Sequence, residues 1–163
     1  MVEGNPMNGW DEFTIEMIIK PDSSSITENF EQRFFHLRSS ENDIRRILIE
    51  LRLLSNNRWS LDTFIKSENS SCTLLDTINY SHQVNEWYHI ALTYQNGIMR
   101  HFVNSKHELS GEVNYIPIEN GQISLGARQD PRSWFKGMIK LAKFSNRVLE
   151  SSEFINIKNY QND

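Results

Sequence analysis

The chain of 163 residues has a net charge of −4 and a pI of about 5.7, which argues against general nucleic-acid binding, because proteins that bind nucleic acids usually carry a basic surface. Its length suits one domain with a core large enough to fold without covalent staples, and aromatic residues make up 11% of it. A single cysteine, Cys72, excludes an internal disulfide. No run of apolar residues is long enough for a membrane-spanning helix.

Short segments of alternating apolar and polar residues dominate the sequence and predict strands. In chain order these are Glu12–Lys20, Arg33–Ser39, Arg46–Leu54, Trp59–Lys66, Thr73–Ile78, the two arms around Asn96–Gly97, Gly121–Arg128 and Ser133–Ser145. Asn-Gly between two apolar runs is the strongest short signal for a hairpin. About eight to ten strands with at most one short helix predict a single all-β antiparallel sandwich over residues 1–163. The segment 146–160 is expected to form either this short helix or a turn, with Ser151 as the candidate N-cap of a helix.

The segment Arg46–Lys66 shows which side chains share a face. Apolar residues alternate along both arms, so we expect one set to face the core: Ile47, Ile49, Leu51, Leu53, Trp59, Leu61, Thr63 and Ile65. The opposite face then carries Glu50, Arg52, Asp62 and Phe64. Two acids, an arginine and an aromatic ring on one face suit a polar ligand platform, and they equally suit a solvated face of cross-strand ion pairs.

The stretch EWYHIALTYQNGIMRHFVNSK (Glu86–Lys106) resembles the laminin-G-like group of the concanavalin A-like lectin/glucanase superfamily. FTIEMIIKP, GQISLGAR and WFKGMIKLAKFSNRVLESSEF agree with that group in the same order, so the resemblance spans Phe13–Phe154. It implies a jelly roll of two facing antiparallel sheets. It also implies that a sugar would bind on the concave sheet face, since that is where sugars bind in this superfamily.

Two departures from the family pattern matter. Only twelve residues precede Phe13, and the family's acidic first-strand motif is missing, so the first strand is either absent or partly replaced by VEGNP, or the chain is cut from a longer protein. Lys140 stands where relatives place an aspartate that can help to hold structural calcium, which argues against calcium here, and we expect no cofactor. No signal peptide is present, so localisation stays open, with export or the cell surface expected for a piece of a longer chain.

The first functional hypothesis is a non-catalytic module for a carbohydrate or protein ligand, with no nucleic-acid partner and no membrane span. Its expected site is the concave face and its rim, formed by Glu50, Arg52, Asp62, Phe64, Arg100, Arg128 and Trp134. Arginine forks suit sugar hydroxyls or carboxylates, so an acidic sugar is conceivable, and aromatic rings suit the apolar face of a sugar. Trp134 equally suits a buried anchor.

Two alternatives belong to other classes. A glycan hydrolase would use Glu50 and Asp62 as an acid pair, which requires carboxyl groups roughly 5–9.5 Å apart. The resemblance argues against it, because Arg52 stands where a glucanase of this fold carries its second acid. A structural docking domain of a larger exported protein would expose a large apolar patch near the N-terminus.

The histidines give weaker indications. No spacing of the five suits a zinc site. His89 occupies the family's usual histidine position, so we expect a structural imidazole tied to a neighbouring backbone group. His36, expected to face the same way as Phe34, is a weaker site candidate.

Overall fold

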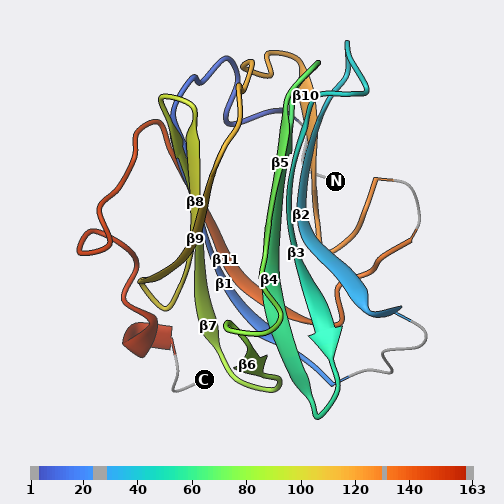
Figure 1. Cartoon of the computed structure of the whole chain (residues 1–163), viewed down its shortest axis with the longest axis vertical. Coiled ribbons are helices and arrows are strands. Elements are labelled where there is room, and N and C mark those ends of the chain that lie inside the picture. Colours follow the sequence, from blue (N-terminus) through green and yellow to red (C-terminus); the bar gives the residue numbers. More distant parts are fainter. Residues whose placement is uncertain (1–3, 24–28, 130–131, 161–163) are drawn as a thin grey trace.

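A computed structural model describes residues 4–23, 29–129 and 132–160 and shows two antiparallel sheets packed face to face (Figure 1). Sheet A runs in the order β10 (Gly121–Leu125), β2 (Glu31–Ser39), β3 (Arg46–Leu54), β4 (Arg58–Lys66) and β5 (Ser71–Leu75), with β6 (His82–Gln83) also paired to β4. Sheet B runs β11 (Gly137–Ser145), β1 (Phe13–Pro21), β7 (Tyr88–Gln95), β8 (Ile98–Val103) and β9 (Lys106–Glu112). The all-β sandwich expected from the sequence is confirmed.

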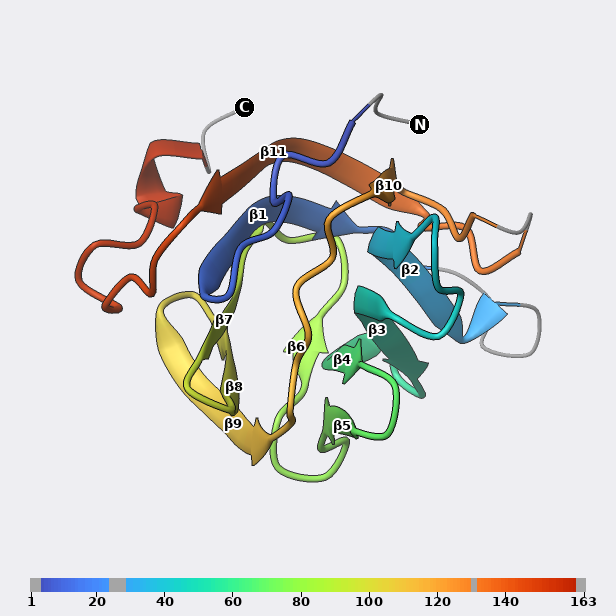
Figure 2. The ribbon, with the colours of Figure 1, turned by 90° about the horizontal axis from the view of Figure 1, so that it is seen from above.

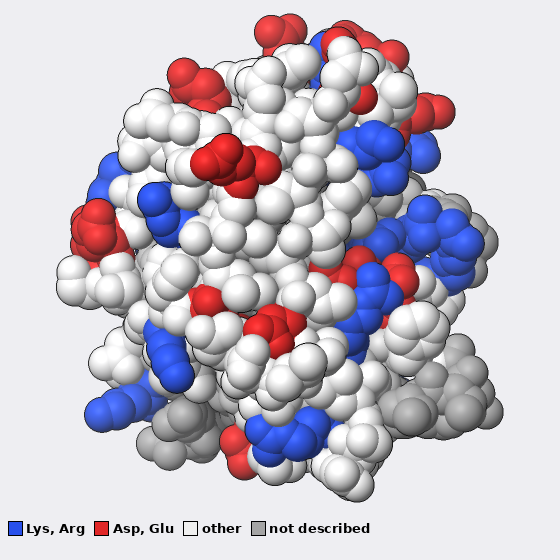
Figure 3. Space-filling view, in the orientation of Figure 1, with Lys and Arg blue, Asp and Glu red and all other residues white. Residues whose placement is uncertain are grey.

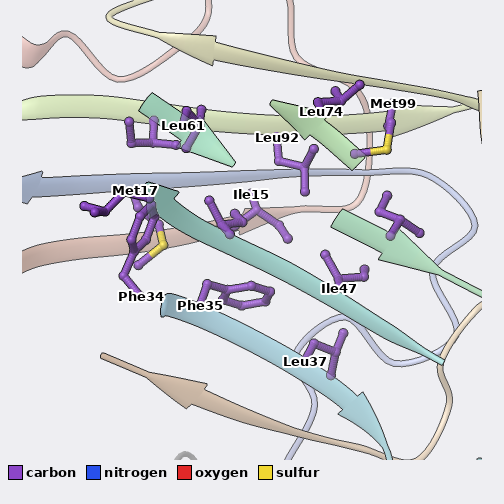
Figure 4. Close-up of a cluster of buried hydrophobic side chains, with 14 of the residues drawn as sticks. Ile15, Met17, Phe34, Phe35, Leu37, Ile47, Leu61, Leu74, Leu92 and Met99 are labelled. Carbon is purple, nitrogen blue, oxygen red and sulfur yellow. The ribbon is translucent and has the colours of Figure 1, made fainter. Parts of the chain in front are cut away.

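The core fills the space between the two sheets (Figure 2). Side chains from both inner faces meet there, among them Ile15, Phe35, Ile47, Leu61 and Leu92 (Figure 4). Burying one such side chain fully contributes roughly 1.5–3 kcal/mol, so this contiguous layer is the main source of stability. The apolar residues that the sequence assigned to the core on β3 and β4 all lie in it or beside it.

Two hairpins form as their turn residues dictate. Asn96 (φ 51°) and Gly97 (φ 82°) both have positive φ, as the turn of a tight two-residue hairpin requires. Between β3 and β4, a loop with Asn56 and Asn57 in the left-handed region sets Glu50 opposite Asp62. This register places every charged residue of the hairpin centre on the outer face of sheet A, as the alternation predicted.

A β-bulge in β2 changes the faces there. The register with β3 shifts between Arg33 and Phe35, and both Phe34 and Phe35 are fully buried. Phe34 packs edge-on against Phe135, with ring centroids 5.5 Å apart. The expectation that His36 faces the same way as Phe34 is therefore wrong, because the extra residue of the bulge sends Phe34 into the core and leaves His36 on the outer face.

The C-terminal segment, expected as a short helix or a turn, forms turns. Residues 151–153 form a turn, and the helical part described is a 3₁₀ turn at Ile157–Tyr160. Leu149 and Phe154 instead pack against Ala91 on the outer face of sheet B. Tertiary burial of these apolar side chains favours the turn over the helix, and Ser151 lies within that turn instead of capping a helix.

The described residues before β1 form turns that close one end of the core. Met7 is fully buried, and the Asn5 side chain donates a hydrogen bond to the Ile118 carbonyl (2.9 Å). Val2 and Glu3, part of the segment expected to replace a first strand, lie outside the described residues. In the described part of the chain, we find no helix with the length and apolar character needed to cross a membrane.

Candidate ligand-binding site

The outer face of sheet A brings together most of the residues expected to bind a ligand. Glu50, Arg52, Asp62 and Phe64 share this face, with Glu50 directly opposite Asp62 and Phe64 opposite Leu48. The loop that follows β10 carries Arg128 and Trp134, and it joins β2 through a bridge between Trp134 and Arg33. In Figure 1 the described part of this loop lies on the outer side of sheet A, to the right.

Arg100 does not belong to this face. It lies on β8 in sheet B, where it pairs with Thr93 and is exposed on the side away from the core. The expectation that Arg100 joins Glu50 and Arg52 is therefore wrong. Alternation placed Arg100 on the outer side of its own strand, but strand periodicity does not say to which sheet a strand belongs.

Five charged residues on this face form one connected network, which we call the charge network (Glu31, Arg33, Glu50, Arg52 and Asp62). The Arg33 Nε donates to Glu50 Oε2 at 2.8 Å, and the Arg52 Nε donates to Asp62 Oδ2 at 2.7 Å. Glu31 accepts from both guanidinium groups. Glu50 and Asp62 are 3% and 1% exposed, so these are buried ion pairs whose partners depend on one another.

The charge network contains three carboxyl groups and two guanidinium groups, so it has one negative charge in excess when every group is ionised. Burial raises the pKa of Glu50 to about 7 against the attraction of Arg33, and the neighbouring charges of Asp62 and Glu31 add to the rise. Burial likewise raises the pKa of Asp62, against Arg52. At neutral pH the charge network is therefore close to the pH at which it takes up one proton, at Glu50.

We expect the folding stability of the protein to fall between pH 5 and pH 8 because of Glu50. A carboxyl with a raised folded pKa stabilises the fold when protonated, so its contribution is complete below about pH 4.5 and is lost as the pH rises through about 7. The loss is about 1–3 kcal/mol. The loss is measured by urea unfolding of the wild type and of Glu50→Gln at pH 5 and pH 8. An equal change in the free energy of unfolding between the two pH values in both proteins would contradict the prediction.

The network also bears on the hydrolase alternative. A glycosidase acid pair needs one carboxylate free to attack or to activate water and one carboxylic acid free to donate a proton. Here Glu50 is bound by Arg33, and Asp62 is bound by Arg52. Both acids are engaged in pairs that hold the sheet face together, which counts against catalysis by this pair.

A shallow hollow of about 270 Å³ lies beside the charge network, lined by Asn29, Phe30, Glu31, Arg128, Arg132 and Ser133. Phe30 and Trp134 are 54% and 56% exposed, which is unusual for such large apolar rings. The exposure of Trp134 contradicts the reading as a buried anchor. The Arg52 guanidinium lies over the Phe30 ring, 5.6 Å from its centroid, so the hollow and the network are continuous.

Backbone contacts hold the hollow in shape. The Asn29 side chain donates to the Trp134 carbonyl at 2.7 Å, and the Arg33 amide donates to the Ser133 carbonyl at 3.0 Å. The two loops on either side of the hollow are therefore fastened to each other and to β2. This arrangement suits a ligand that stacks on an aromatic ring and receives hydrogen bonds from arginine forks.

Three residues of the site that were not found from the sequence are Phe30, Glu31 and Arg33. The adjacent pair Phe34-Phe35 in an otherwise alternating strand signals a bulge, and a bulge would have placed Arg33 on the outer face. Phe30 lies in the loop before β2, where the alternation of a strand does not predict the direction of a side chain. Its role depends on the loop after β10, which is about 100 positions away in the chain.

The hollows elsewhere differ in the chemistry that they offer: one of about 360 Å³ has Tyr80, His82, Lys106 and Glu108 in its lining. One of about 550 Å³ is lined by Ser70, the Asn96–Gly97 turn and residues 112–114, and it offers one carboxylate and neither an aromatic ring nor a basic group. Within the described ranges, no three His, Cys, Asp or Glu side chains lie together as a metal site would need. Lys140, at the family's calcium position, places its ammonium over Trp87, 5.5 Å from the ring centroid.

His89 is structural, as expected, but its partner differs. Its ring is fully buried, and Nε2 lies 3.1 Å from the Glu16 carboxylate, not against a backbone group. The same carboxylate accepts bonds from Lys143 and from the Ile155 amide. This cluster fastens the C-terminal segment to sheet B, on the opposite side of the sandwich from the candidate site.

Two facing sheets with a polar, aromatic-edged outer face define a lectin-like β-sandwich. The chain belongs to the concanavalin A-like lectin/glucanases superfamily, whose family model matches residues 3–154. A search of curated protein sequences found no match.

Solved structures with the same fold come from several sources. A SAP-like pentraxin from Limulus polyphemus is 15% identical, with a TM-score of 0.68 over 86% of this chain and 66% of the pentraxin chain, so this chain spans slightly less than two thirds of that relative. The CBM40 domain of a Ruminococcus gnavus sialidase, solved with α2,3-sialyllactose bound, is 16% identical, with a TM-score of 0.66 over 89% and 81% of the two chains. A tailspike protein of bacteriophage CBA120 is 14% identical, with a TM-score of 0.65 over 89% and 23%. At these identities the likeness shows the fold alone.

Proposed function

We propose that this protein is a non-catalytic carbohydrate-binding module whose site is the outer face of sheet A. The observation that carries the proposal is the hollow beside the charge network, where the exposed ring of Phe30 lines the same hollow as Arg128 and Arg132, and the exposed Trp134 directly follows the lining residue Ser133. A pyranose ring has an apolar face that stacks on an aromatic ring and hydroxyl groups that accept bonds from guanidinium forks. Similar folds that bind sugars, including the sialyllactose-bound CBM40 domain, support the same class of ligand.

Each part of the site has a distinct role in this proposal. Trp134 and Phe30 provide the stacking surfaces at the rim. Arg52 provides donors, because its guanidinium lies over Phe30 and is only partly used by Asp62 and Glu31. Glu50, which is buried and paired with Arg33, also attracts the Arg52 guanidinium and so restricts its position. The Arg52 side chain therefore loses little conformational freedom when a ligand binds.

Trp134→Ala is expected to weaken glycan binding about tenfold, because truncating an exposed aromatic anchor typically costs more than 1 kcal/mol of binding free energy. The measurement is a concentration series on an array of neutral and acidic glycans, with and without calcium. Ile78→Ala is the matched control, since Ile78 is 89% exposed and lies in the turn after β5, outside the site.

Two outcomes of this experiment contradict the proposal. If the wild type gave no signal on the array, the proposal that the ligand is a carbohydrate would be wrong, and a docking domain of a larger protein would be favoured. Signals of equal strength for the wild type and Trp134→Ala would show that sugars bind elsewhere on the molecule.

A further inference from the structure

Three basic residues stand side by side across three strands of sheet A. Arg38 on β2 is directly opposite Arg46 on β3, and Arg46 is directly opposite Lys66 on β4. We call them the basic row (Arg38, Arg46 and Lys66). They point to the same outer face as Phe64, and directly opposed residues lie roughly 5 Å apart at their Cβ atoms. Figure 3 shows Lys and Arg gathered on this side of the molecule, at the right of the view.

In the part of the chain that the structure describes, no carboxylate forms an ion pair with the basic row. Among residues 4–23, 29–129 and 132–160, the carboxylates nearest in the adjoining loops are used elsewhere or point to solvent: Glu68 pairs with Arg45, Glu41 accepts from Asn120, and Asp43 is exposed. The Arg46 guanidinium instead lies over the Phe64 ring, 5.5 Å from its centroid. Like charges directly opposite each other destabilise a sheet.

The electrostatics of Arg46 show the same excess of positive charge. Burial lowers the pKa of Arg46, and the positive charges of Arg128, Arg33 and Arg38 lower it further. The charge network, by contrast, balances its arginines with carboxylates on the same face. The row is therefore a local surplus of positive charge that a bound anion would neutralise.

A buried hydrogen-bond donor lies next to the row. His36 is two residues before Arg38 on β2 and is 3% exposed. Its Nδ1 accepts a long bond from the Gln129 amide at 3.4 Å, and burial together with the positive charges of Arg33, Arg128, Arg38 and Arg46 lowers its pKa to about 3. The ring is thus neutral at physiological pH, with its proton on Nε2, which has no partner among the described residues.

We propose that the basic row binds the oxyanion of an acidic glycan, a carboxylate or a sulfate, beside the neutral ring of His36. The glycan part rests on the proposed function of the same face. Two guanidinium forks and an ammonium suit an oxyanion, and charge-assisted bonds of this kind are about twice as strong as neutral ones. Arg46 and Arg52 are six residues apart on β3, about 20 Å along a strand, so one extended oligosaccharide passing over Phe64 would reach both the row and the hollow.

The first test uses inorganic sulfate and needs no glycan. We expect sulfate to raise the Tm of the wild type with saturation in the low millimolar range, and we expect Arg38→Gln/Arg46→Gln to lose that response. Saturation is essential, since sulfate at high concentration stabilises most proteins. Sodium chloride at equal ionic strength is the salt control. Arg100→Gln is the control for the single substitutions, because it removes one positive charge from the outer face of sheet B.

Two readouts keep this test decisive. Without sulfate, the double variant is expected to have a Tm no lower than that of the wild type, because it removes a like-charge contact. If the double variant fails to fold, Arg38→Gln and Lys66→Gln are measured singly, and each is expected to weaken sulfate binding about tenfold. No saturable response in the wild type, or equal responses in the wild type and the variants, would overturn the row as an anion site.

The second test compares 3′-sialyllactose with lactose, which differ by one carboxylated sugar. The wild type is expected to prefer the acidic sugar, and the double variant is expected to lose that preference, about tenfold or more, while it still binds through the hollow. If the wild type and the double variant preferred 3′-sialyllactose over lactose equally, the proposed function would stand, but the basic row would not be the site that binds the oxyanion. If sulfate bound to the basic row but neither sugar bound to the protein, the row would stand as an anion site and the proposed function would be refuted. Binding of a single-stranded oligonucleotide in place of both sugars would overturn the glycan as the ligand class.

Discussion

Replacing Arg33 with methionine is expected to lower the free energy of unfolding by about 3–5 kcal/mol. Arg33 donates two bonds to Glu50, and both side chains are buried, with 4% of each exposed. Removing the guanidinium leaves a carboxylate without its partner in a place that water does not reach. Breaking one half of a buried pair is much more costly than deleting the whole pair.

Chemical denaturation in urea, with an unchanged m-value as evidence of an intact transition, measures the effect. Arg147→Met is the matched control, since Arg147 pairs with Glu153 at the surface and its loss is expected to change stability little. Arg33→Met combined with Glu50→Leu is expected to recover most of the loss. If Arg33→Met were no more destabilising than Arg147→Met, the charge network would not be the structural base of the site.

Acid is expected to destabilise the protein through Glu16, and Glu16→Gln is expected to remove that effect. Burial alone would raise the pKa of Glu16, but the bonds from His89, Lys143 and the Ile155 amide outweigh it and hold the pKa at about 2. A carboxyl with a lowered folded pKa stabilises the fold above about pH 4.5, and this stabilisation is lost as the pH falls toward about 2. The loss is about 3 kcal/mol.

At pH 7, Glu16→Gln is expected to cost about 2–4 kcal/mol, because the amide cannot pair with Lys143 and leaves buried donors poorly matched. Glu153→Gln is the matched control: Glu153 also has a pKa lowered to about 2, through its bond from Arg147, but it lies at the surface, where water and salt screen the interaction. Acid and urea titrations of the three proteins make the comparison. Equal acid midpoints for the wild type and Glu16→Gln would show that this cluster does not fasten the C-terminal segment.

Much of the fold can be predicted because local patterns specify it. Alternation on β3 and β4 assigned core and outer faces correctly, and Asn96–Gly97 marked its hairpin. The features that the sequence left open or placed wrongly depend on contacts distant in the chain. The choice between a helix and a turn for the C-terminal segment depends on the burial of Leu149 and Phe154 against sheet B, and no local preference contains that information.

The candidate site could be predicted only in part, for the same reason. Glu50, Arg52 and Asp62 were found because they share one hairpin. Phe30 and the segment Ser133-Trp134 come together only because the loops that carry them are fastened by hydrogen bonds across the sheet edge. Arg100 was misplaced because a strand's own pattern does not state which sheet it joins.

The most direct test of the central claim, that ligand binds on the outer face of sheet A, follows the indole N–H signals of the four tryptophans by NMR. The protein is titrated with the glycan that gives the strongest array signal. We expect the Trp134 signal to shift and saturate, while the signal of Trp59, which is fully buried in the core, stays in place. A Trp134 signal that does not move while the glycan saturates the protein would contradict the claim.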